Sequence, residues 1–335
     1  MAVNEKHITD RFALYNGDSC EVLCDLPDSS VGFSVYSPPF SELYNYSSSE
    51  RDLSNCKSYD EFMCHYEFIV SQIARVTKPG RLSAVHCMDL KRGTDMSRDF
   101  PGDIIRLYER NGFDYFTRVT IWKEPYAVRM RTMVRGLAHK QIVEDSSLCC
   151  TARPDYLVVM TKKGDNKEPI VHPEGLTEYA GVFDPKERAQ LGYLPIPQKY
   201  LAFKGRTDLP PRENKWSHWV WRQYASSVWM DVRAGRVMPY QEARETPEEK
   251  HICPLQLDVI ERCVTLWSNP GDTVLTPFLG VGSEAYTAVK LGRRAIGIEL
   301  KPSYYRQAVR NVEAALKQDA IEQDDFLGEV EQIAE

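Results

Sequence analysis

The stretch Val31-Gly-Phe-Ser-Val-Tyr-Ser-Pro-Pro-Phe40 decides the architecture of this chain. Its first half is β-branched and aromatic, a composition typical of a strand. The consecutive prolines, Pro38 and Pro39, fit neither a helix interior nor a central strand, so the backbone has to leave the sheet there. The sequence therefore predicts a strand that ends in a rigid, exposed lip, Ser37 to Phe40.

The lip carries groups suited to a planar ring that bears an amino group. Pro38 and Pro39 have no N–H, so nearby carbonyl oxygens stay free as acceptors. Ser37 adds a hydroxyl, and Phe40 adds a flat apolar face. A Pro-Pro turn that merely ends an ordinary strand has the same sequence, so these four residues by themselves leave both interpretations open.

Strands and helices alternate around this stretch. The segment 12–18 predicts a short strand, followed by a helix that ends near Pro27. Downstream, the apolar spacing predicts a helix over 59–77, which Lys78-Pro-Gly80 stops. The same reasoning predicts a helix over 104–110 and strands over 81–87, 113–122 and 156–161. Such alternation is typical of an α/β protein with a largely parallel sheet and helices on its faces.

A second block, near the C-terminus, has the pattern of a nucleotide site. A helix over 255–267 precedes a strand over 272–278, the glycine turn Leu279-Gly-Val-Gly282, a helix over 283–291 with Ser283 as its predicted N-cap, and a strand over 293–299. Glycines let the backbone approach a ligand closely, and Glu299 at the strand end can accept hydrogen bonds from ribose hydroxyls. The turn lacks the third glycine of a dinucleotide site and the lysine of a P-loop. A nucleoside without a diphosphate therefore fits better, and S-adenosylmethionine is such a ligand.

The two motifs together resemble a known family. Ser37-Pro-Pro-Phe40 resembles the catalytic motif of S-adenosylmethionine-dependent DNA amino-methyltransferases. Pro277-Phe-x-Gly-x-Gly282, followed by Gly297-x-Glu299, resembles their cofactor motif. The order of the motifs, with the lip first, is that of the β class. The resemblance implies a permuted Rossmann-like methyltransferase sheet with helices on both faces and an irregular inserted recognition region.

The resemblance also implies roles for particular residues. Catalysis would belong to the lip, Ser37, Pro38, Pro39 and Phe40. The cofactor site would take residues from both motifs and their flanks: Asp18, Ser37, His251, Pro254, Thr276, Phe278, Gly280, Gly282, Ser283 and Glu299. Asp18 matches an acid that lies near the cofactor's adenine in the family, although a simple turn aspartate is equally compatible.

Thr276 departs from the family pattern, which commonly has aspartate at that position. The departure removes a negative charge that would face the positive methionine end of the cofactor. Ser283, Glu284 or the 251–254 region would then hold that end.

The implied reaction is methyl transfer to the exocyclic amino group of a base flipped out of double-stranded DNA. Ser37 and the Pro38 carbonyl would accept hydrogen bonds from the amino protons, and Phe40 would stack on the base. In the family, serine at the first lip position is mostly associated with N4 of cytosine, so this base is favoured over N6 of adenine. An RNA methyltransferase and a non-catalytic DNA-binding relative are the alternatives, and Thr276 is the feature that favours the latter.

A basic stretch lies between the two motifs. From Arg118 to Lys140 the basic residues face a single acid, Glu124. A helix here would lay an Arg-rich face on a phosphate backbone, and the predicted DNA contacts are Arg129, Arg131, Arg135, His139 and Lys140. The alternative is a solvated helix that packs on the sheet by its apolar side.

The regular pattern is lost from about Gly164 to Lys250. The segment from Trp216 to Trp229 holds four of the six tryptophans, which predict either stacking on unpaired bases or, preferably, the core of a small subdomain. We therefore divide the chain into a catalytic half (1–163), an inserted target-recognition region (164–248), a cofactor-binding half (249–318) and an acidic tail (319–335).

Composition limits the class of protein. The chain has no apolar run long enough to span a bilayer and no signal-peptide core, so we expect a cytoplasmic protein. The resemblance implies that a prokaryote or a phage encodes it and that it acts on DNA. The net charge of −6 argues against bulk coating of nucleic acid but allows a local basic cleft. The nine cysteines lack C-x-x-C spacing, which predicts reduced, mostly buried thiols and no metal site. The resemblance leaves open a homodimer and a partner restriction endonuclease.

Overall fold

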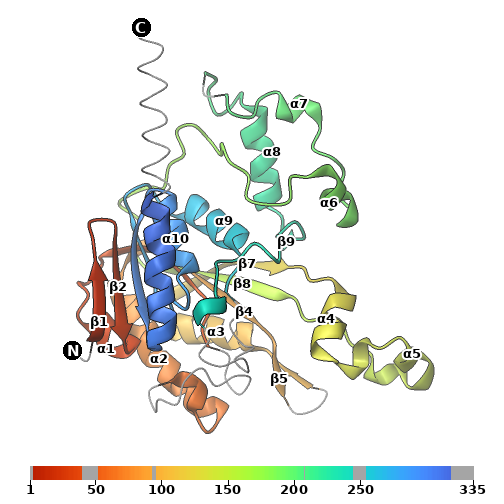
Figure 1. Ribbon diagram of the computed structural model, residues 1–335, viewed down its shortest axis with the longest axis horizontal. Coiled ribbons are helices and arrows are strands. Elements are labelled where there is room, and N and C mark those ends of the chain that lie inside the picture. Colours follow the sequence, from red (N-terminus) through yellow and green to blue (C-terminus); the bar gives the residue numbers. More distant parts are fainter. Residues whose placement is uncertain (1–2, 40–51, 93–95, 207, 244–253, 318–335) are drawn as a thin grey trace. The chain divides into compact units, whose positions relative to one another are not determined.

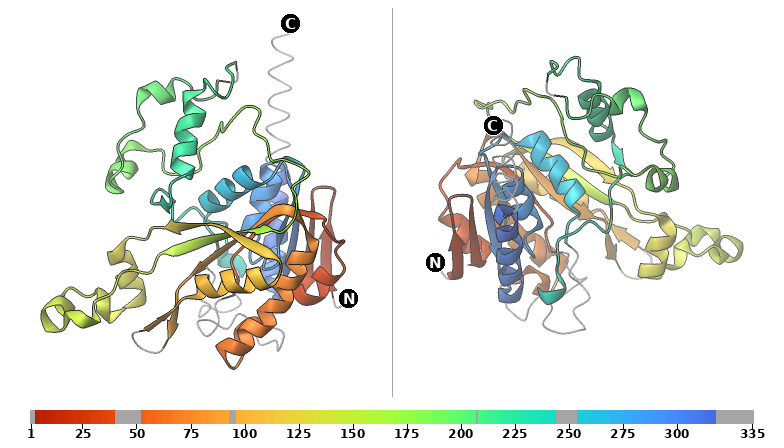
Figure 2. Two further views of the ribbon diagram at one scale, coloured as in Figure 1. Left: turned by 180° about the vertical axis from the view of Figure 1, so that it is seen from behind. Right: turned by 45° about the horizontal axis from the view of Figure 1, so that its top comes forward.

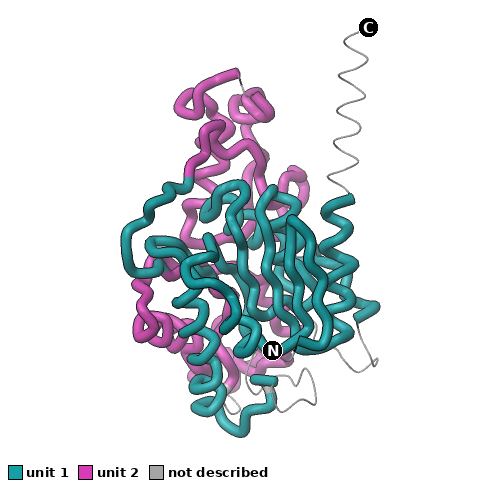
Figure 3. Tube along the Cα trace, turned by 90° about the vertical axis from the view of Figure 1, so that its left-hand side faces the viewer, with its two compact units in different colours: residues 1–84, 161–170, 234–335 teal, residues 85–160, 171–233 magenta. Residues whose placement is uncertain are grey.

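The computed structural model describes residues 3–39, 52–92, 96–206, 208–243 and 254–317. The chain divides into two compact units, each made of segments distant in sequence (Figure 3). Unit 1 comprises 1–84, 161–170 and 234–335, and unit 2 comprises 85–160 and 171–233. The functional division at positions 163, 248 and 318 stays a prediction, because the two units are defined by contacts alone.

Unit 1 is built on a sheet that is parallel over most of its width. Its strand order is β1-β2-β11-β10-β3-β4. The strands are β1 (Val3–Ile8), β2 (Phe12–Gly17), β3 (Val31–Tyr36), β4 (Thr77–Met88, in this unit as far as Ala84), β10 (Thr273–Thr276) and β11 (Arg294–Glu299). The pairs β3–β10, β10–β11 and β11–β2 are parallel, whereas β1 runs antiparallel to β2.

Helices cover both faces of this sheet, which confirms the predicted α/β class (Figures 1 and 2). On one face α9 (Leu257–Trp267) packs against α10 (Ser283–Lys290). On the other face α1 (Ser19–Cys24) packs against α2 (Tyr59–Val76), which the turn η1 (Leu53–Asn55) precedes. Residues 302–317 form a further helix.

The predicted strand 31–36 and helix 59–77 are confirmed. Every residue of β3 is buried, as expected of a parallel strand covered on both faces. Ser58 caps α2 by accepting a hydrogen bond from Glu61 N, and the apolar face of the helix is buried. The predicted end of the helix before Lys78 is confirmed, but the strand predicted over 81–87 begins earlier, since β4 already includes Thr77 to Gly80. A proline is tolerated at the beginning of a strand, where its missing N–H costs no ladder bond.

Unit 2 has the strand order β8-β7-β9 and a separate antiparallel hairpin. Its strands and its first helix are β5 (Leu90–Arg92), β6 (Met96–Arg98), α3 (Phe100–Arg110), β7 (Phe113–Ile121), β8 (Asp155–Lys162, in this unit as far as Met160) and β9 (Val228–Trp229). The predicted strands over 113–122 and 156–161 are confirmed. The helix predicted over 104–110 begins already at Phe100, because Asp99 caps it by accepting a hydrogen bond from Gly102 N.

Between β7 and β8 the chain forms a projecting arm, residues 125–148 (Figure 1). The arm consists of α4 (Pro125–Thr132), η2 (Arg135–Leu137), α5 (Lys140–Glu144) and η3 (Ser146–Leu148). α4 has no buried residue, and Met130 and Met133 are exposed. The alternative of a helix packed on the sheet by its apolar side is therefore wrong. A single long helix is also excluded, because α4 ends where Met133 adopts a left-handed conformation.

The segment predicted to lack regular structure contains helices. They are α6 (Pro185–Gln190), α7 (Gln198–Leu201) and α8 (Lys215–Tyr224) in unit 2, with the turn η4 (Gln241–Ala243) in unit 1. α8 runs through the tryptophan tract, where Trp216 stacks on Trp219 with ring centroids 5.0 Å apart. Both are buried, as is Trp229, so the prediction of a subdomain core is confirmed for these three, whereas Trp221 is 53% exposed.

The described cysteines are all free thiols. Cys87 and Cys263 are buried, but the exposed ones are Cys24, Cys64, Cys149 and Cys150. The expectation that most are buried is therefore wrong, in part because Cys149 and Cys150 lie in the exposed segment that follows the arm. Within the described ranges, no helix combines the length and apolar character needed to cross a membrane.

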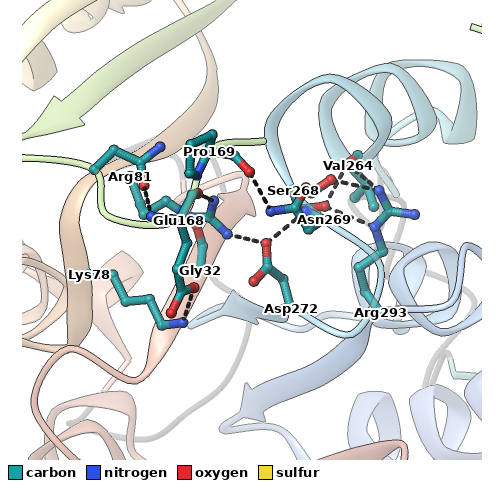
Figure 4. Close-up of polar contacts among 11 residues, drawn as sticks. Gly32, Lys78, Arg81, Glu168, Pro169, Val264, Ser268, Asn269, Asp272 and Arg293 are labelled. Carbon is teal, nitrogen blue, oxygen red and sulfur yellow. Dashed lines mark hydrogen bonds and ion pairs between the residues drawn. The ribbon is translucent and has the colours of Figure 1, made fainter. Parts of the chain in front are cut away.

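A buried arginine ties together separate segments of unit 1 (Figure 4). Arg81, in β4, is 1% exposed. Its Nε donates to the carbonyl oxygen of Gly32 (3.0 Å), its Nη1 to that of Glu168 (2.9 Å), and its Nη2 to the carboxylate of Asp272. The carboxylate also accepts the N–H of Asn269 at 2.7 Å. These bonds connect the start of β3, the first half of β4, the turn before β10 and the segment 161–170.

Removing Asp272 should strongly destabilise unit 1. In Asp272→Ala the buried guanidinium of Arg81 would keep its charge without an ionic partner, so we expect a loss of about 3–5 kcal/mol in the free energy of unfolding. Chemical denaturation measures this loss. The double variant Arg81→Met/Asp272→Asn removes both charges and should be clearly more stable than Asp272→Ala. Equal stability of the two variants would show that the charge of Arg81 is not the cause.

Candidate functional site

Four strand ends of unit 1 lie at one edge of the sheet, because β2, β3, β10 and β11 run in parallel. The residues at these ends are Asp18 after β2, Ser37 after β3, Thr276 at the end of β10 and Glu299 at the end of β11. In open α/β sheets, ligands bind outside the carboxyl ends of the strands. This edge is therefore the candidate site, and it brings together both motifs that the sequence singles out.

Glu299 connects the end of β11 to the glycine turn. Its Oε2 accepts the N–H of Gly280 at 2.8 Å, and its Oε1 accepts that of Lys301 at 2.9 Å. Burial raises the pKa of Glu299 to about 7, and these two hydrogen bonds only partly oppose the shift. Asn16, which sequence reasoning missed, donates to the Glu299 carbonyl oxygen at 2.8 Å and so fixes the strand end.

The glycine turn has the backbone shape that only glycine adopts readily. Gly280 and Gly282 have φ values of +54° and +91°. A Cβ at Gly282 would lie 3.1 Å from the Cα of Ala308, whereas no described residue lies within 4 Å of a Cβ built on Gly280. The turn is therefore closed on the side of the 302–317 helix and open beside Gly280. Gly282, not Ser283, occupies the N-cap position of α10, because its left-handed φ ends the turn one residue earlier.

Two buried polar side chains lie at the end of β10 and in the first turn of α10. Thr276 is 1% exposed, and its hydroxyl has no hydrogen-bond partner among the described residues. Glu284, in the first turn of α10, is also buried, which raises its pKa to about 8. A buried polar group without a partner is costly, so an unpaired hydroxyl at a strand end is a candidate ligand contact.

The turn after β2 packs against the cofactor motif. Ser19 Oγ donates to the carbonyl oxygen of Pro277, so the start of α1 and the cofactor motif are joined directly. Asp18 caps α1 by accepting the N–H of Cys20 at 2.8 Å. This is the turn aspartate that the sequence allows, and its role toward an adenine stays a prediction. No signal in the sequence singles out Ser19.

The lip rests on an aromatic support. The hydroxyls of Tyr36 and Tyr66 hydrogen-bond at 2.7 Å, and the ring of Phe278 lies against both tyrosines at centroid distances of 5.7 and 6.2 Å. Pro38 is buried, whereas Ser37 and Pro39 are partly exposed. The end of β3 is thus held by Phe278, two residues after β10, and by Tyr66 of α2, and the prediction of an exposed lip is wrong for Ser37 to Pro39 because these rings pack against it. Tyr66 is known from the sequence only as part of the apolar face of α2.

Other predicted site residues lie elsewhere. Phe40 and His251 fall outside the described residues, and Pro254 begins the segment that leads into α9. The predicted DNA contacts Arg129, Arg131, Arg135, His139 and Lys140 all lie in the arm of unit 2. Some of them have partners there: Arg135 Nε donates to Gln141 Oε1 at 2.8 Å, and Lys140 pairs with Glu144 at 3.5 Å.

The residues at the edge of unit 1 fit S-adenosylmethionine. The open side of Gly280 gives a ligand room beside the backbone. Glu299 offers a carboxylate for ribose hydroxyls, and the unpaired hydroxyl of Thr276 offers a further polar contact. The described residues include no cluster of three His, Cys, Asp or Glu side chains that could hold a metal ion.

Comparison with known proteins agrees with this geometry. M.BglII, a type II methyltransferase of Bacillus subtilis, is 26% identical over 295 residues, which are 87% of this chain and 66% of that protein. The chain thus spans about two thirds of the length of this relative. The protein TTHA0409 of Thermus thermophilus, solved in complex with S-adenosyl-L-methionine, superposes with a TM-score of 0.55 at 20% identity over 90% of this chain and 96% of that one.

The cytosine-N4-specific PvuII DNA methyltransferase superposes with a TM-score of 0.51 at 15% identity, covering 92% of this chain and 89% of that one. At these identities the two structures show a common fold. The model of the DNA methylase family (N6_N4_Mtase) matches residues 31–310, a range that includes the lip and the glycine turn. Because this match spans most of the sequence, the chain belongs to the DNA methylase family.

Proposed function

We propose that this protein transfers a methyl group from S-adenosylmethionine to the exocyclic amino group of a base in double-stranded DNA, with N4 of cytosine as the preferred acceptor. The observation that carries the proposal is the convergence of the lip and the Glu299–Gly280 turn at one edge of unit 1. Family membership supports DNA as the substrate, and the ligand of TTHA0409 supports the cofactor. A homodimer and a restriction endonuclease partner stay predictions from the resemblance.

S-adenosylmethionine, when bound, supplies a methyl group on a positively charged sulfur. Glu299 would accept hydrogen bonds from the ribose hydroxyls, and the open side of Gly280 would let the ligand lie against the backbone. Thr276 and Glu284 would take the place of the aspartate that the family commonly has at the end of this strand. Glu284 suits a cationic group, because a nearby positive charge would favour its ionised form.

The lip would orient the acceptor base. Ser37 and the Pro38 carbonyl oxygen would accept hydrogen bonds from the amino protons, which draws the nitrogen toward sp3 geometry and makes its lone pair available. The lone pair forms the new N–C bond while the C–S bond breaks with its electrons staying on sulfur, and an amino proton is released to solvent. Phe40, which lies outside the described residues, would stack on the flipped base.

Incubation with radiolabelled S-adenosylmethionine and duplex DNA, followed by nucleoside mass spectrometry, tests the proposed reaction. N4-methylcytosine is the expected product. N6-methyladenine would keep the enzyme class but contradict the inference from Ser37. Cofactor binding without a methylated nucleoside would favour a non-catalytic relative, and methylation of an RNA control in place of DNA would overturn the substrate.

Substitutions should separate the two halves of the site. Ser37→Ala removes an acceptor for the amino protons, so we expect a fall of about 100-fold in kcat with cofactor affinity nearly unchanged. Glu299→Ala removes the ribose contact and should weaken cofactor binding about 10- to 100-fold. Calorimetric titration with the cofactor and single-turnover kinetics give the two quantities. The reverse pattern would contradict the assigned roles.

Cofactor affinity should depend on pH through Glu299. Its pKa in the free protein is about 7, and ribose hydroxyls donate to the ionised carboxylate, so binding favours the deprotonated form. Affinity should therefore be full above pH 7 and decrease as the pH falls through 7, by about tenfold from pH 8 to pH 6. Glu299→Gln is the control, since it cannot ionise and should reduce this pH dependence. A flat profile for the unaltered protein would disprove the linkage.

A further inference from the structure

The helix 302–317 lies against the glycine turn and carries two buried amides there. Ala308 is the residue of this helix whose Cα would lie 3.1 Å from a Cβ at Gly282. Gln307 and Asn311 are buried beside it. Residues four positions apart lie on the same face of a helix, so the two amides are neighbours. This pair belongs to unit 1, and neither sequence motif includes it.

The amide of Asn311 uses all of its polar atoms. Its Nδ2 donates to the carbonyl oxygen of Val281 at 2.7 Å and to that of Pro239 at 3.1 Å. Its Oδ1 accepts from Gln307 Nε2 at 2.9 Å. Two acceptors on one side and a donor on the other fix which way the amide points. Asn311 thus joins the glycine turn to the segment 234–243, where the chain enters unit 1 after unit 2.

The peptide between Val281 and Gly282 is held from both sides. Its N–H donates within the turn to the carbonyl oxygen of Leu279 at 2.9 Å. Its carbonyl oxygen accepts the bond from Asn311. Glycine adopts positive and negative φ about equally well, so Gly282 by itself does not prevent this peptide from rotating. The bond from Asn311 is therefore one of the constraints that keep the turn in its shape.

The other partner of Asn311 is anchored independently. Pro239 lies in the segment that begins after unit 2, and Arg236 fixes this segment to α9. Arg236 Nη1 donates to Asp258 Oδ1 at 2.7 Å, and its Nη2 donates to Glu261 Oε1 at 2.6 Å. The segment would therefore stay in place without the amide of Asn311, and the loss of that amide would act mainly on the glycine turn.

We propose that Asn311 is a positioning residue for the cofactor: its bond to the Val281 carbonyl oxygen keeps the glycine turn in the shape that leaves the side of Gly280 open to S-adenosylmethionine. Asn311 acts through the turn and needs no contact with the ligand. Glu299 holds the other part of the turn by accepting the N–H of Gly280 at 2.8 Å. A turn that already has its binding shape lowers the cost of ordering when the ligand arrives. This inference rests on the proposed function, which places the cofactor at this turn.

Calorimetric titration of the full chain with S-adenosylmethionine, in the absence of DNA, tests this role. Asn311→Asp keeps the size of the side chain but replaces its NH2 donor by an oxygen, so we expect the dissociation constant to rise about tenfold.

A second variant leaves Asn311 itself unchanged. Gln307→Glu replaces the donor to Asn311 Oδ1 by a carboxylate, which would attract the N–H groups of Asn311 away from the turn. Arg310, whose Nη2 donates to Gln307 Oε1 at 2.5 Å, would stay as the partner of the new charge. This variant should also weaken cofactor binding, and it decides the question if Asn311→Asp folds poorly.

Steady-state kinetics separate positioning from a merely structural role. For Asn311→Asp, the KM for the cofactor should rise about as much as the dissociation constant, whereas kcat at saturating cofactor should stay within about twofold. If Asn311 only stabilised the fold, the melting temperature and the active fraction would fall while cofactor affinity and KM stayed the same. That result would overturn the proposal.

Glu242→Gln is the matched control. Glu242 lies in the same segment as Pro239, and its exposed carboxylate pairs with Arg310 at 3.6 Å. The variant removes this link to the helix 302–317 without changing the bond to Val281, so it should bind the cofactor like the unaltered protein. An equal loss of affinity in Glu242→Gln and Asn311→Asp would contradict a role of the Val281 bond.

The outcome is separate from that of the proposed function, because cofactor binding requires neither DNA nor methyl transfer. Unchanged dissociation constants in Asn311→Asp and Gln307→Glu would overturn the positioning role even if the unaltered protein methylates DNA. Weaker cofactor binding by both variants of a protein that transfers no methyl group would support the positioning role and overturn the reaction alone.

Discussion

The parallel pairing of β3 with β10 is the constraint on which the candidate site depends. Val274 pairs with Phe33 and Leu275 with Ser34, which sets the lip after β3 beside the glycine turn after β10. Parallel strands cannot be joined by a tight turn, so motifs far apart in sequence meet only when long crossovers bring their strands together. The register of these two strands therefore determines whether a base acceptor and a cofactor turn share one edge.

In unit 1, the partners of the buried charged groups Arg81 and Glu299 differ between the two ends of the sheet. Arg81, near the amino ends of the strands, has an acidic partner and two carbonyl acceptors, so its charge is fully compensated. Glu299, at the carboxyl edge, has only backbone N–H donors, and burial raises its pKa. The first arrangement holds segments together, whereas the second leaves a carboxyl group ready for a ligand.

In unit 2, α8 likewise has a buried face that packs in a core and an exposed face. The stacked rings of Trp216 and Trp219 form a core under α8, and Arg188, also buried, lies over the ring of Trp219. Trp221 is left outside this core. A rigid core is what allows an exposed face to keep its side chains in place without a partner.

The sequence by itself determined the α/β class, the strand ending at the lip and the glycine turn, because each depends on local chemistry: Pro38 and Pro39 end a strand, and Gly280 and Gly282 adopt positive φ. The missing third glycine of the turn also showed, from the sequence alone, that the site suits a nucleoside without a diphosphate better than a dinucleotide. Local patterns failed for α8, because its tryptophans face both the core and the solvent and hide the helical period.

Only the tertiary structure decided which residues meet. The bond from Ser19 to Pro277, the contact of Tyr66 with Phe278 and the unpaired hydroxyl of Thr276 all depend on how distant segments pack. No local pattern contains that information, since a side chain's burial and partners are set by residues elsewhere in the chain. The same holds for Trp221, whose exposure follows from which face of α8 the subdomain core covers.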